Sequence, residues 1–574
     1  MKKRLYSKIP LAQTIVALCE AKGIHHIVIS PGSRNAPLTI GFSEHPEMKC
    51  YSIVDERCAA FFALGIAQQI QKPVALVCTS GSALLNYYPA ISEAFYSDIP
   101  LVVLSADRPI ERIDIGDGQT IRQKNVFENH ILYSANLYSE VVAETKVKDI
   151  KIRQKQREAQ KHNEREINLA LNRAIEKKGP VHINVPFYEP LYDKVDQPTV
   201  FPKNIPIEDP QYIISDDLHS KMIKEWNQAT RKMVLVGVNS PEKIDQQWID
   251  YFANDPSVLV LTETTSNIHH SSHINCIDQL ITSLTKEEFE NLQPDILLTI
   301  GGMVISKRIK AFLREYQPKS HWHVDEKKAF DTYFCLTEHI RLDVNSFFSD
   351  FLPKTNTIQG NYKSTWVAVR DHRRMRHAEF LKQSSFTDLT VFEAIFDNIP
   401  EDQMIQLSNS STVRYAQLFS LHPSFKVFCN RGTSGIDGST STAIGAALAS
   451  GTPTTLITGD LSFFYDSNGL WNAYIPSNFK IILINNGGGG IFRILPGKEE
   501  SDNFSQFFET IHNLSAEHLC KMYGIEYNKA ITLEEVNNGI QQMYIHNDSS
   551  QLLEIFTPRK ENDSTLIDYF RCFV

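Results

Sequence analysis

The sequence lacks the features that mark membrane, disulfide-rich and nucleic-acid-binding proteins. None of its apolar runs is long enough to span a membrane, and its basic start has no continuous apolar stretch of the kind that signal peptides carry. Its nine cysteines form no CxxC pair and several stand inside apolar runs, which favours buried free thiols in a reducing compartment. A net charge of −9 over 574 residues is poorly suited to general binding of nucleic acid or anionic membranes. We therefore expect a cytoplasmic protein without membrane insertion and without a nucleic-acid partner.

What the sequence does have is a repeated alternation of short apolar runs and helical patterns. Runs such as "HHIVIS", "PVALVCTS", "KMVLVGV", "DILLTIGG" and "KIILINN" are nearly continuous in apolar residues, as strands buried on both faces are. Such strands separated by helices predict an α/β fold of doubly wound parallel sheets, and the chain is too long for one core. Two loose segments, residues 196–216 and 353–366, separate three predicted domains, which are residues 1–195, 217–352 and 367–574.

The segment "ITGDLSFFYDSNGLWNAYIPSNFKIILINNGGGGIF", residues 457–492, places polar residues after two of these predicted strands. Asp460 follows the first strand, and Asn485, Asn486 and four glycines follow the second. The carboxyl ends of parallel strands meet at one edge of a sheet, and carboxylate, amide and backbone oxygens together suit Mg²⁺. Taken alone, the same residues are equally compatible with a helix cap at Asp460 and a glycine turn after Asn486.

The spacing between the two polar groups favours the metal site. Twenty-four residues separate Asp460 from Asn485, and Gly-Asp followed at this interval by Asn-Asn resembles the diphosphate motif of the thiamine diphosphate enzymes. The resemblance implies thiamine diphosphate and Mg²⁺ or Mn²⁺ as cofactors. By this resemblance the metal ligands are Asp460, Asn486 and the backbone carbonyl of Gly488, and the neighbouring cofactor-binding residues are Gly459, Leu461 and Ser462.

A carboxyl group in the first predicted domain extends the resemblance. Thiamine diphosphate becomes nucleophilic only when a carboxyl group hydrogen-bonds to its aminopyrimidine ring in a dry site. In "YSIVDERCAAFFALGIA", Glu56 follows a strand and opens a helix of small residues, which is how these enzymes present their activating glutamate. The alternative is an acidic residue stabilised by the helix dipole. Glu56 is thus the candidate catalytic residue, and by the same resemblance it also binds the cofactor.

A third block, "CNRGTSGIDGSTSTAIGAALASG" (residues 429–451), combines a glycine-rich loop with a helix of small residues. Such a helix is expected to pack closely on a neighbouring helix. In the thiamine diphosphate enzymes, a bulky residue at the position of Ile436 holds the two rings of the cofactor in a bent shape. Ile436 is therefore a further cofactor contact that the resemblance implies.

Basic residues at predicted strand ends point to acidic substrates. Each one alone is more often part of a surface ion pair than a ligand contact. Several of them at loop mouths in an acidic protein predict an electropositive pocket for substrates with several carboxylates. These residues and their polar neighbours are Ser33, Arg34, Arg108, Gln119, Lys307, Arg308, Ser410, Arg414 and Arg431.

Nearly the whole chain resembles one branch of the thiamine diphosphate enzymes, the 2-succinyl-5-enolpyruvyl-6-hydroxy-3-cyclohexene-1-carboxylate synthases of menaquinone biosynthesis. The blocks that carry this resemblance are "SPGSRNAPL", "DERCAAFFALG", "ADRP", "QTIRQ", "NRGTSGIDG", "GDLSFFYD" and "NNGGGGIF". It implies decarboxylation of 2-oxoglutarate and conjugate addition of the succinyl carbanion to isochorismate. It also implies a homodimer or homotetramer with active sites shared between subunits.

The resemblance divides the predicted substrate residues into three groups. Ser410, Arg414 and Arg431 are expected to hold the part derived from 2-oxoglutarate, and Ile491, Phe492 and Leu495 are expected to form an apolar wall. The residues expected to face isochorismate are Ser33, Arg34, Arg108, Gln119, Lys307 and Arg308. Gly118 and Gly490 stand where the family often has Asn and Gln, which can alter the fit of the substrates.

Parts of the sequence are also compatible with two other functions and contain two weaker motifs. Another thiamine diphosphate decarboxylase or carboligase would share the cofactor motif but not this set of basic blocks. A catalytically silent regulatory relative would keep the fold, although intact Glu56, Asp460 and Asn486 disfavour it. The histidines of "NIHHSSH" (residues 267–273) fit a surface loop better than a metal site. "TIGGMV" contains no GxGxxG and is weak support for dinucleotide binding.

Overall fold

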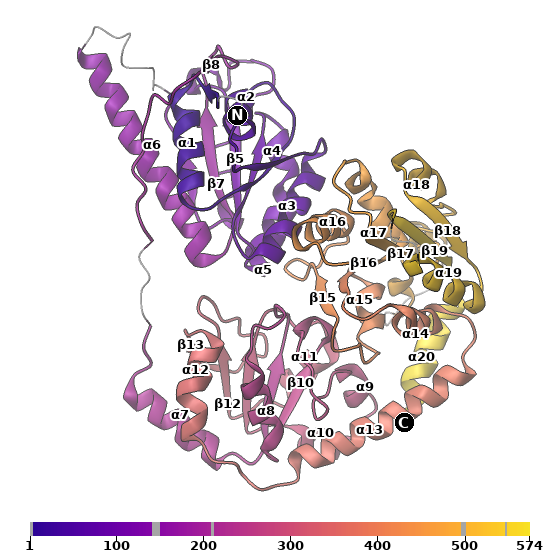
Figure 1. The fold of residues 1–574 in the computed structure, drawn as a ribbon. Helices are drawn as coiled ribbons and strands as arrows, with labels where there is room; N and C mark the ends of the chain where they lie inside the picture. Colours follow the sequence, from indigo (N-terminus) through magenta and orange to yellow (C-terminus); the bar gives the residue numbers. More distant parts are fainter. Residues whose placement is uncertain (1–3, 140–149, 208–211, 495–500, 546–547, 574) are drawn as a thin grey trace. The chain divides into compact units, whose positions relative to one another are not determined.

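The computed structural model describes residues 4–139, 150–207, 212–494, 501–545 and 548–573 (Figure 1). The chain divides into two compact units. The first unit comprises Met1–Asp209, Gly432–Thr452 and Ser462–Phe479, and the second comprises Pro210–Arg431, Pro453–Leu461 and Lys480–Val574. One large sheet and a two-stranded sheet lie in the first unit, and two large sheets lie in the second. These sheets confirm the predicted α/β class, while the exact domain limits stay predictions.

The first unit is built on a six-stranded sheet with the strand order β3-β2-β4-β5-β7-β6, whose described pairs are all parallel. The two inner strands β4 and β5 are buried along their whole length, as their runs of Val, Leu and Ala predict. The strands are β2 His26–Ile29, β3 Lys49–Ser52, β4 Val74–Cys78, β5 Leu101–Asp107, β6 Ser134–Asn136 and β7 Val181–Pro186, and a small antiparallel pair joins β1 Tyr6–Ser7 to β8 Lys194–Val195. The helices are α1 Pro10–Ala21, α2 Ala36–Ser43, α3 Glu56–Ile70, α4 Ala83–Asn86, α5 Tyr88–Ser97, α6 Ile150–Lys177 and α16 Ser439–Ser450.

Helices α3 and α16 of the first unit cross at very close range. A side-chain carbon at Gly65 would lie 2.0 Å from the carbonyl oxygen of Thr442, and one at Gly445 would lie 2.0 Å from that of Phe62. Only glycine permits this approach of the two backbones. The close helix packing that the small side chains of segment 429–451 predict is therefore confirmed.

The second unit contains a five-stranded sheet, ordered β10-β9-β11-β12-β13, and a six-stranded sheet, ordered β15-β14-β16-β17-β19-β18. The strands of the first are β9 Lys232–Val236, β10 Val258–Thr262, β11 Ile296–Ile300, β12 Ser320–Val324 and β13 Leu336–Ile340. Those of the second are β14 Met404–Leu407, β15 Lys426–Cys429, β16 Thr454–Gly459, β17 Phe479–Asn485, β18 Glu526–Ala530 and β19 Gln551–Phe556. Every strand predicted in these two regions is present.

Helices cover both sheets of the second unit, and two of them carry predicted substrate residues. These are α11 Lys307–Glu315, beside the five-stranded sheet, and α15 Ser411–Ala416, beside the six-stranded one. The other helices are α7 Asp216–Gln228, α8 Gln246–Asn254, α9 Ile277–Ile281, α10 Lys286–Leu292, α12 Val344–Phe351, α13 Tyr362–Gln383, α14 Asp388–Asn398, α18 Glu517–Tyr523, α19 Leu533–Ile545 and α20 Glu561–Arg571. The short helix α17, Asp460–Tyr465, follows β16 directly.

Buried hydrogen bonds tie the two sheets of the second unit to one another. The side chain of Gln279, on α9, donates to the carbonyl oxygen of Leu418 at 2.7 Å and to the hydroxyl of Tyr569 at 2.6 Å. Asn267 donates to the carbonyl oxygen of Val427 and accepts from its N–H group. Because these bonds are buried or partly buried, they fix the helices that carry the functional residues of this unit.

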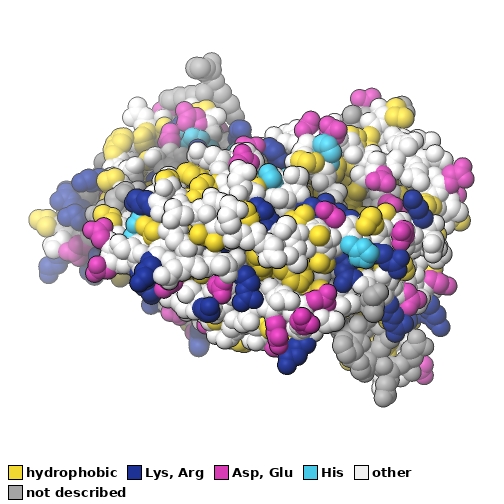
Figure 2. Space-filling model, turned by 90° about the horizontal axis from the view of Figure 1, so that it is seen from below, with side chains coloured by type: hydrophobic (Ala, Val, Ile, Leu, Met, Phe, Trp, Pro, Cys, Tyr) yellow, Lys and Arg dark blue, Asp and Glu magenta, His cyan; other side chains and the backbone are white. Residues whose placement is uncertain are grey.

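The described helices, the cysteines and the charged surface residues bear on the predictions made from the composition. Among the described helices, none is both long and apolar enough to cross a bilayer. All nine cysteines are free thiols, and most of them are buried. On the face shown in Figure 2, acidic and basic side chains are interspersed, in keeping with 58 basic and 67 acidic residues in the chain.

Candidate active site

The two halves of the predicted metal motif meet at the carboxyl ends of β16 and β17. Asp460 is buried at the start of α17, and its Oδ2 accepts a hydrogen bond of 3.0 Å from the N–H group of Gly488. Its Oδ1 accepts one of 2.6 Å from the N–H group of Leu461. Asn485 turns away, since its side chain donates to Glu554 at 2.7 Å. Asp460, Asn486 and the loop around Gly488 are therefore the part of the motif that faces a common site.

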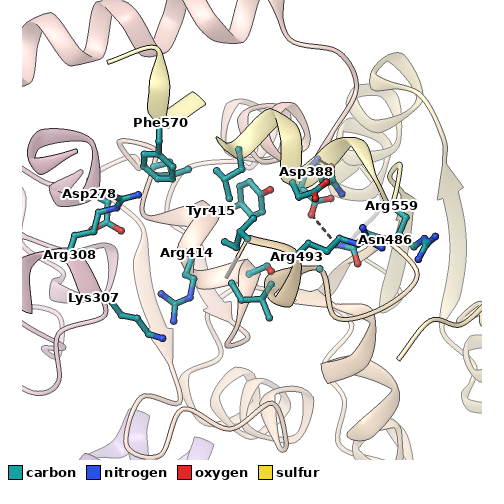
Figure 3. A pocket seen from close by; sticks show the side chains of 18 residues that line it. Asp278, Lys307, Arg308, Asp388, Arg414, Tyr415, Asn486, Arg493, Arg559 and Phe570 are labelled. Atoms are coloured by element: carbon teal, nitrogen blue, oxygen red, sulfur yellow. Dashed lines mark hydrogen bonds between the residues drawn. The ribbon is translucent and has the colours of Figure 1, made fainter. Parts of the chain in front are cut away.

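Asn486 is held by a second buried carboxylate, that of Asp388. The Nδ2 of Asn486 donates to Oδ2 of Asp388 at 3.0 Å (Figure 3). Burial raises the pKa of Asp388 to about 6, and hydrogen bonds from Thr557 and Asn486 act against this rise. Because the amide nitrogen faces Asp388, the amide oxygen of Asn486 is left for another partner.

The oxygens at this edge of the sheet fit a hard divalent cation. One carboxylate, one amide oxygen and one backbone carbonyl form a set that Mg²⁺ and Mn²⁺ accept, with water and phosphate oxygens completing the shell. Gly488 has φ of +148°, and a side-chain carbon there would lie 2.6 Å from the carbonyl oxygen of Glu509. Only glycine allows this loop to lie against Asp460. Within the described residues no cluster of three or more His, Cys, Asp or Glu side chains offers an alternative metal site.

A cavity of about 170 Å³ lies in the second unit next to this edge. It brings together predicted residues from two sheets, because α11 contributes Lys307 and Arg308 while α15 contributes Arg414 (Figure 3). The loop after β17 contributes Asn486 and Ile491. The cavity also has charged lining residues that sequence reasoning missed, namely Asp278, Asp388, Arg493, Arg559 and Asp563.

The surroundings of Arg414 suit a carboxylate ligand. Burial lowers the pKa of Arg414, and the positive charge of Arg431 lowers it further. Among the described residues, the buried Nε of Arg414 has no hydrogen-bond partner. Arg431 donates to the side chain of Asn409 at 2.6 Å, and Ser410, just before α15, has φ of +69°. A half-buried cation with a spare buried donor favours an anionic ligand, and a positive φ at a serine is the kind of strain found near functional sites.

The start of α11 is anchored by Glu263 and Asp278. Glu263 is buried, and its two carboxylate oxygens accept the N–H groups of Ile305 and Ser306, each at 2.7 Å. The hydroxyl of Ser306 donates in turn to Asp278. Since Lys307 follows directly, these bonds determine where the helix presents its cations. Burial raises the pKa of Glu263 to about 7, helped by Asp278 and opposed by the two N–H groups and Arg431.

The raised pKa of Glu263 gives a pH-dependent stability. Between about pH 4.5, where this group titrates in an unfolded chain, and pH 7, the folded protein holds a proton that the unfolded chain has lost. The contribution of Glu263 to stability therefore falls as pH rises through this window. We expect the thermal midpoint of the wild type to drop relative to that of Glu263→Gln as pH is raised from 5 to 8. Parallel midpoint–pH profiles of the two proteins would contradict the assignment.

The predicted isochorismate residues of the first unit lie at the carboxyl edge of its sheet. Arg34 is buried and donates to Glu189 at 3.0 Å and to the carbonyl oxygen of Phe187 at 3.1 Å, whereas Ser33 is exposed. Arg108 directly follows β5, and its Nε donates to the carbonyl oxygen of Gly118 at 3.1 Å. Arg34 thus has structural partners, so binding of a substrate there would add to existing contacts.

Gln119 lies on an exposed loop over a buried polar network. It has φ of +55°, and its backbone lies against Gly81. The N–H group of Gly81 donates to the side chain of Gln123 at 2.9 Å, and Gln123 donates to Asn184 at 2.9 Å. Through Gly81, this network positions the backbone of the loop at Gln119.

Glu56 is the first residue of α3 but does not cap it. The cap is Asp55, whose Oδ1 accepts the N–H group of Cys58 at 3.2 Å. The carboxylate of Glu56 accepts a hydrogen bond of 3.2 Å from Asn86. Asp55 therefore caps the helix, and Glu56 lies in its first turn, where the helix-dipole alternative also places it.

Ile436 presents its side chain to the surface of the first unit. It is 38% exposed, and its carbonyl oxygen accepts the hydroxyl of Ser462 at 2.6 Å. The preceding loop is pinned by the buried Glu93, which accepts the N–H groups of Gly432 and Thr433 at 2.7 and 2.6 Å. A rigid backbone under an exposed apolar side chain suits a contact with a ligand.

One sequence-based expectation is met only in part, and two residues of the predicted apolar wall lie outside the cavity lining or outside the described residues. The histidine loop of residues 267–273 is not wholly at the surface, because His273 is buried and its pKa is lowered to about 3 by burial. Phe492 is absent from the cavity lining and instead contacts the ring of Phe508, with centroids 6.2 Å apart. Leu495 lies outside the described residues.

Three family models match separate regions that together make up most of the chain. Residues 9–134 match the family described as "Thiamine pyrophosphate enzyme, N-terminal TPP binding domain". Residues 209–407 match "Middle domain of thiamine pyrophosphate", and residues 409–555 match "Thiamine pyrophosphate enzyme, C-terminal TPP binding domain". The cofactor-binding motifs of the sequence thus fall in the first and last of the three matched regions.

Relatives from three bacteria carry the name 2-succinyl-5-enolpyruvyl-6-hydroxy-3-cyclohexene-1-carboxylate synthase. The protein of Christiangramia forsetii is 60% identical over 570 residues, which are 98% of this chain and 99% of that protein. That of Flavobacterium johnsoniae is 54% identical over 99% of both chains. That of Porphyromonas gingivalis is 36% identical over 98% of this chain and 97% of its own.

Proposed function

Because this chain belongs to the thiamine pyrophosphate enzymes, and within them to the 2-succinyl-5-enolpyruvyl-6-hydroxy-3-cyclohexene-1-carboxylate synthases, we propose that it makes this compound for menaquinone biosynthesis. The substrates are 2-oxoglutarate, which loses carbon dioxide, and isochorismate, which receives the succinyl unit. The observation that carries the choice of acidic substrates is the cavity in which Lys307, Arg308 and Arg414 converge beside Asn486.

The chain's residues have distinct roles toward the cofactor. Asp460, Asn486 and the carbonyl of Gly488 would hold Mg²⁺ or Mn²⁺, which neutralises the diphosphate, and Gly459, Leu461 and Ser462 would lie along it. Thiamine diphosphate, when bound, supplies a nucleophilic carbon and an electron sink for the decarboxylation. Glu56 would hold a proton at the aminopyrimidine ring, and Ile436 would provide the apolar contact that supports the cofactor.

The basic residues bind and orient the two acids. Arg414, Arg431 and Ser410 would hold the carboxylates of 2-oxoglutarate through charge-assisted hydrogen bonds. Lys307 and Arg308, together with the first-unit residues Ser33, Arg34, Arg108 and Gln119, would hold isochorismate. Ile491 with Phe492 and Leu495 would exclude water. Fixing both reactants in this way converts an encounter in solution into a reaction within one site.

The assembly and the location are part of the same proposal. Active sites shared between the subunits of a homodimer or homotetramer would bring Glu56 of one subunit to the diphosphate end of another, and the location would be cytoplasmic.

Mixing inactive Glu56→Gln protein with inactive Asp460→Ala protein should restore part of the activity if the sites are shared. Mixed samples that remain as inactive as the separate variants would contradict shared sites.

Release of carbon dioxide tests the proposed reaction directly. We expect release from 2-oxoglutarate only when thiamine diphosphate and Mg²⁺ or Mn²⁺ are present, with much faster turnover once isochorismate is added. Pyruvate in place of 2-oxoglutarate should release little. Preference for pyruvate would favour another decarboxylase or carboligase of the family, and failure to bind the cofactor would favour a silent relative.

Replacing Arg414 by alanine should chiefly impair the use of 2-oxoglutarate. Loss of a charge-assisted hydrogen bond of about 1.5–3 kcal/mol predicts that kcat/KM for this substrate falls roughly 10- to 100-fold. The KM for isochorismate should change far less. Arg571→Ala is the matched control, because Arg571 is an exposed arginine of the same unit that pairs with Asp568. Unchanged kinetics with 2-oxoglutarate would remove Arg414 from its binding site.

A further inference from the structure

Asp388 is a buried carboxylate to which the mechanism above assigns no role. It is the first residue of α14 and lines the cavity beside Asn486. Its Oδ2 accepts the Nδ2–H of Asn486 at 3.0 Å, and its Oδ1 accepts the hydroxyl of Thr557 at 2.6 Å. Its backbone N–H group donates to the side chain of Asn562 at 2.8 Å. Both ends of the residue are therefore fixed by segments that follow β19.

The position of Asp388 is not explained by the helix that it begins. The cap of α14 is Thr387, which forms a reciprocal pair of hydrogen bonds with Thr390. Those bonds satisfy the helix start without the side chain of Asp388. Burying a carboxylate is costly unless hydrogen bonds compensate. Its two carboxylate oxygens bind Thr557 and Asn486, so a function of Asp388 is expected to act through these two residues.

The bond to Asn486 determines which end of the amide faces the metal position. An asparagine side chain has one oxygen that can bind a cation and one NH₂ group that cannot, and the two ends have nearly the same shape. A carboxylate only accepts hydrogen bonds, so the NH₂ group of Asn486 must face Asp388. The oxygen of Asn486 is then turned away from Asp388, as Figure 3 shows.

We propose that Asp388 is a positioning residue that orients the amide of Asn486 so that its oxygen binds the divalent cation. This inference rests on the proposed function, because it assumes that Asn486 is a metal ligand. Thr557 holds the carboxylate of Asp388 in place, so the orientation is transmitted from the end of β19 through Asp388 to the loop after β17. Partners of this kind outside the ligand set commonly change metal affinity 10- to 100-fold.

The experiment measures Mn²⁺ affinity with saturating thiamine diphosphate, by the electron paramagnetic resonance signal of free Mn²⁺. We expect Asp388→Ala to weaken Mn²⁺ binding roughly 10- to 100-fold. Asp388→Asn keeps an oxygen that can accept from Asn486 and should retain most of the affinity. Asp397→Asn, at the other end of α14, is the control and should bind like the wild type. If Asp388→Ala does not fold, Asp388→Leu fills the volume without an acceptor and carries the same expectation.

A double-mutant cycle with Asn486→Ala separates positioning from a general structural role. If Asp388 acts through Asn486, the double variant should bind Mn²⁺ no more weakly than Asn486→Ala alone. Losses that add up would overturn the inference, and so would full affinity in Asp388→Ala. A wild type that binds no Mn²⁺ with the cofactor present would overturn the proposed function as well, which distinguishes the two failures.

Discussion

Glu56→Gln protein is expected to bind thiamine diphosphate nearly as tightly as the wild type while its turnover falls roughly 10²- to 10⁴-fold, the range for loss of a positioned proton-transfer group. Glutamine keeps the size of the side chain and can still accept from Asn86, but it cannot hold and release a proton. Since Asp55 rather than Glu56 caps α3, the substitution should leave the helix intact. The reduced turnover would therefore report chemistry and not folding.

The measurements for this prediction are kcat for carbon dioxide release and a cofactor titration of the same samples. Asp55→Asn is a matched control, because it changes the neighbouring carboxylate and keeps an oxygen for the N–H group of Cys58. Its turnover should stay close to that of the wild type. Near-normal turnover of Glu56→Gln would remove Glu56 from the mechanism.

The inner strands of the three large sheets and the edge strands β3, β10 and β15 could be predicted from the sequence, but the edge strands β6, β13 and β18 could not. Inner strands such as β4, β11 and β17 are continuous apolar runs, because both of their faces are covered. The edge strands β6 "SAN", β13 "LTEHI" and β18 "EYNKA" are short or rich in polar residues. Where an edge strand is exposed to solvent, as these three are in part, its composition resembles that of a loop.

The site could be predicted only where a motif with fixed spacing recorded it. Asp460 and Asn486 stand at an interval typical of the family, and the cavity that contains Arg414 and Lys307 follows from basic residues at strand ends. Asp388 gave no such signal, because an acidic residue at a helix start is ordinary. Its role depends on a hydrogen bond to a residue 98 positions away.

The wall of the cavity also contains a buried ion triad that no motif announced. Glu509 is fully buried at the end of a short π-helix, Phe504–Glu509. Its oxygens accept from Nε and Nη2 of the buried Arg493, the first of these bonds being 2.6 Å, and from Nη1 of Arg559 at 3.1 Å. Both arginines line the cavity. Glu509 therefore holds two cations of the cavity wall, Arg493 and Arg559, and with Arg493 the loop that carries Ile491.

Glu509→Ala should be strongly destabilised, because it leaves Arg493 buried without its counter-charge. Breaking a buried ion pair in this way costs about 3–5 kcal/mol, which in a chain of this size corresponds to a drop of the thermal midpoint of roughly 3–7 °C. Calorimetry should show this drop. Glu315→Ala, at an exposed glutamate of the same unit, should change the midpoint by no more than about 1 °C.

The double variant Arg493→Met, Glu509→Leu separates the stability of the triad from its role at the cavity. Apolar residues of similar volume often replace a buried ion pair without loss, and Arg559 is partly exposed and can be hydrated. The double variant should therefore regain most of the thermal midpoint. Because the loop and Arg559 are no longer held by Glu509, its KM values for the two acids should remain raised. Recovery of both stability and KM would mean that the triad only fills space, whereas an unchanged midpoint in Glu509→Ala would mean that the three charges do not form a buried cluster.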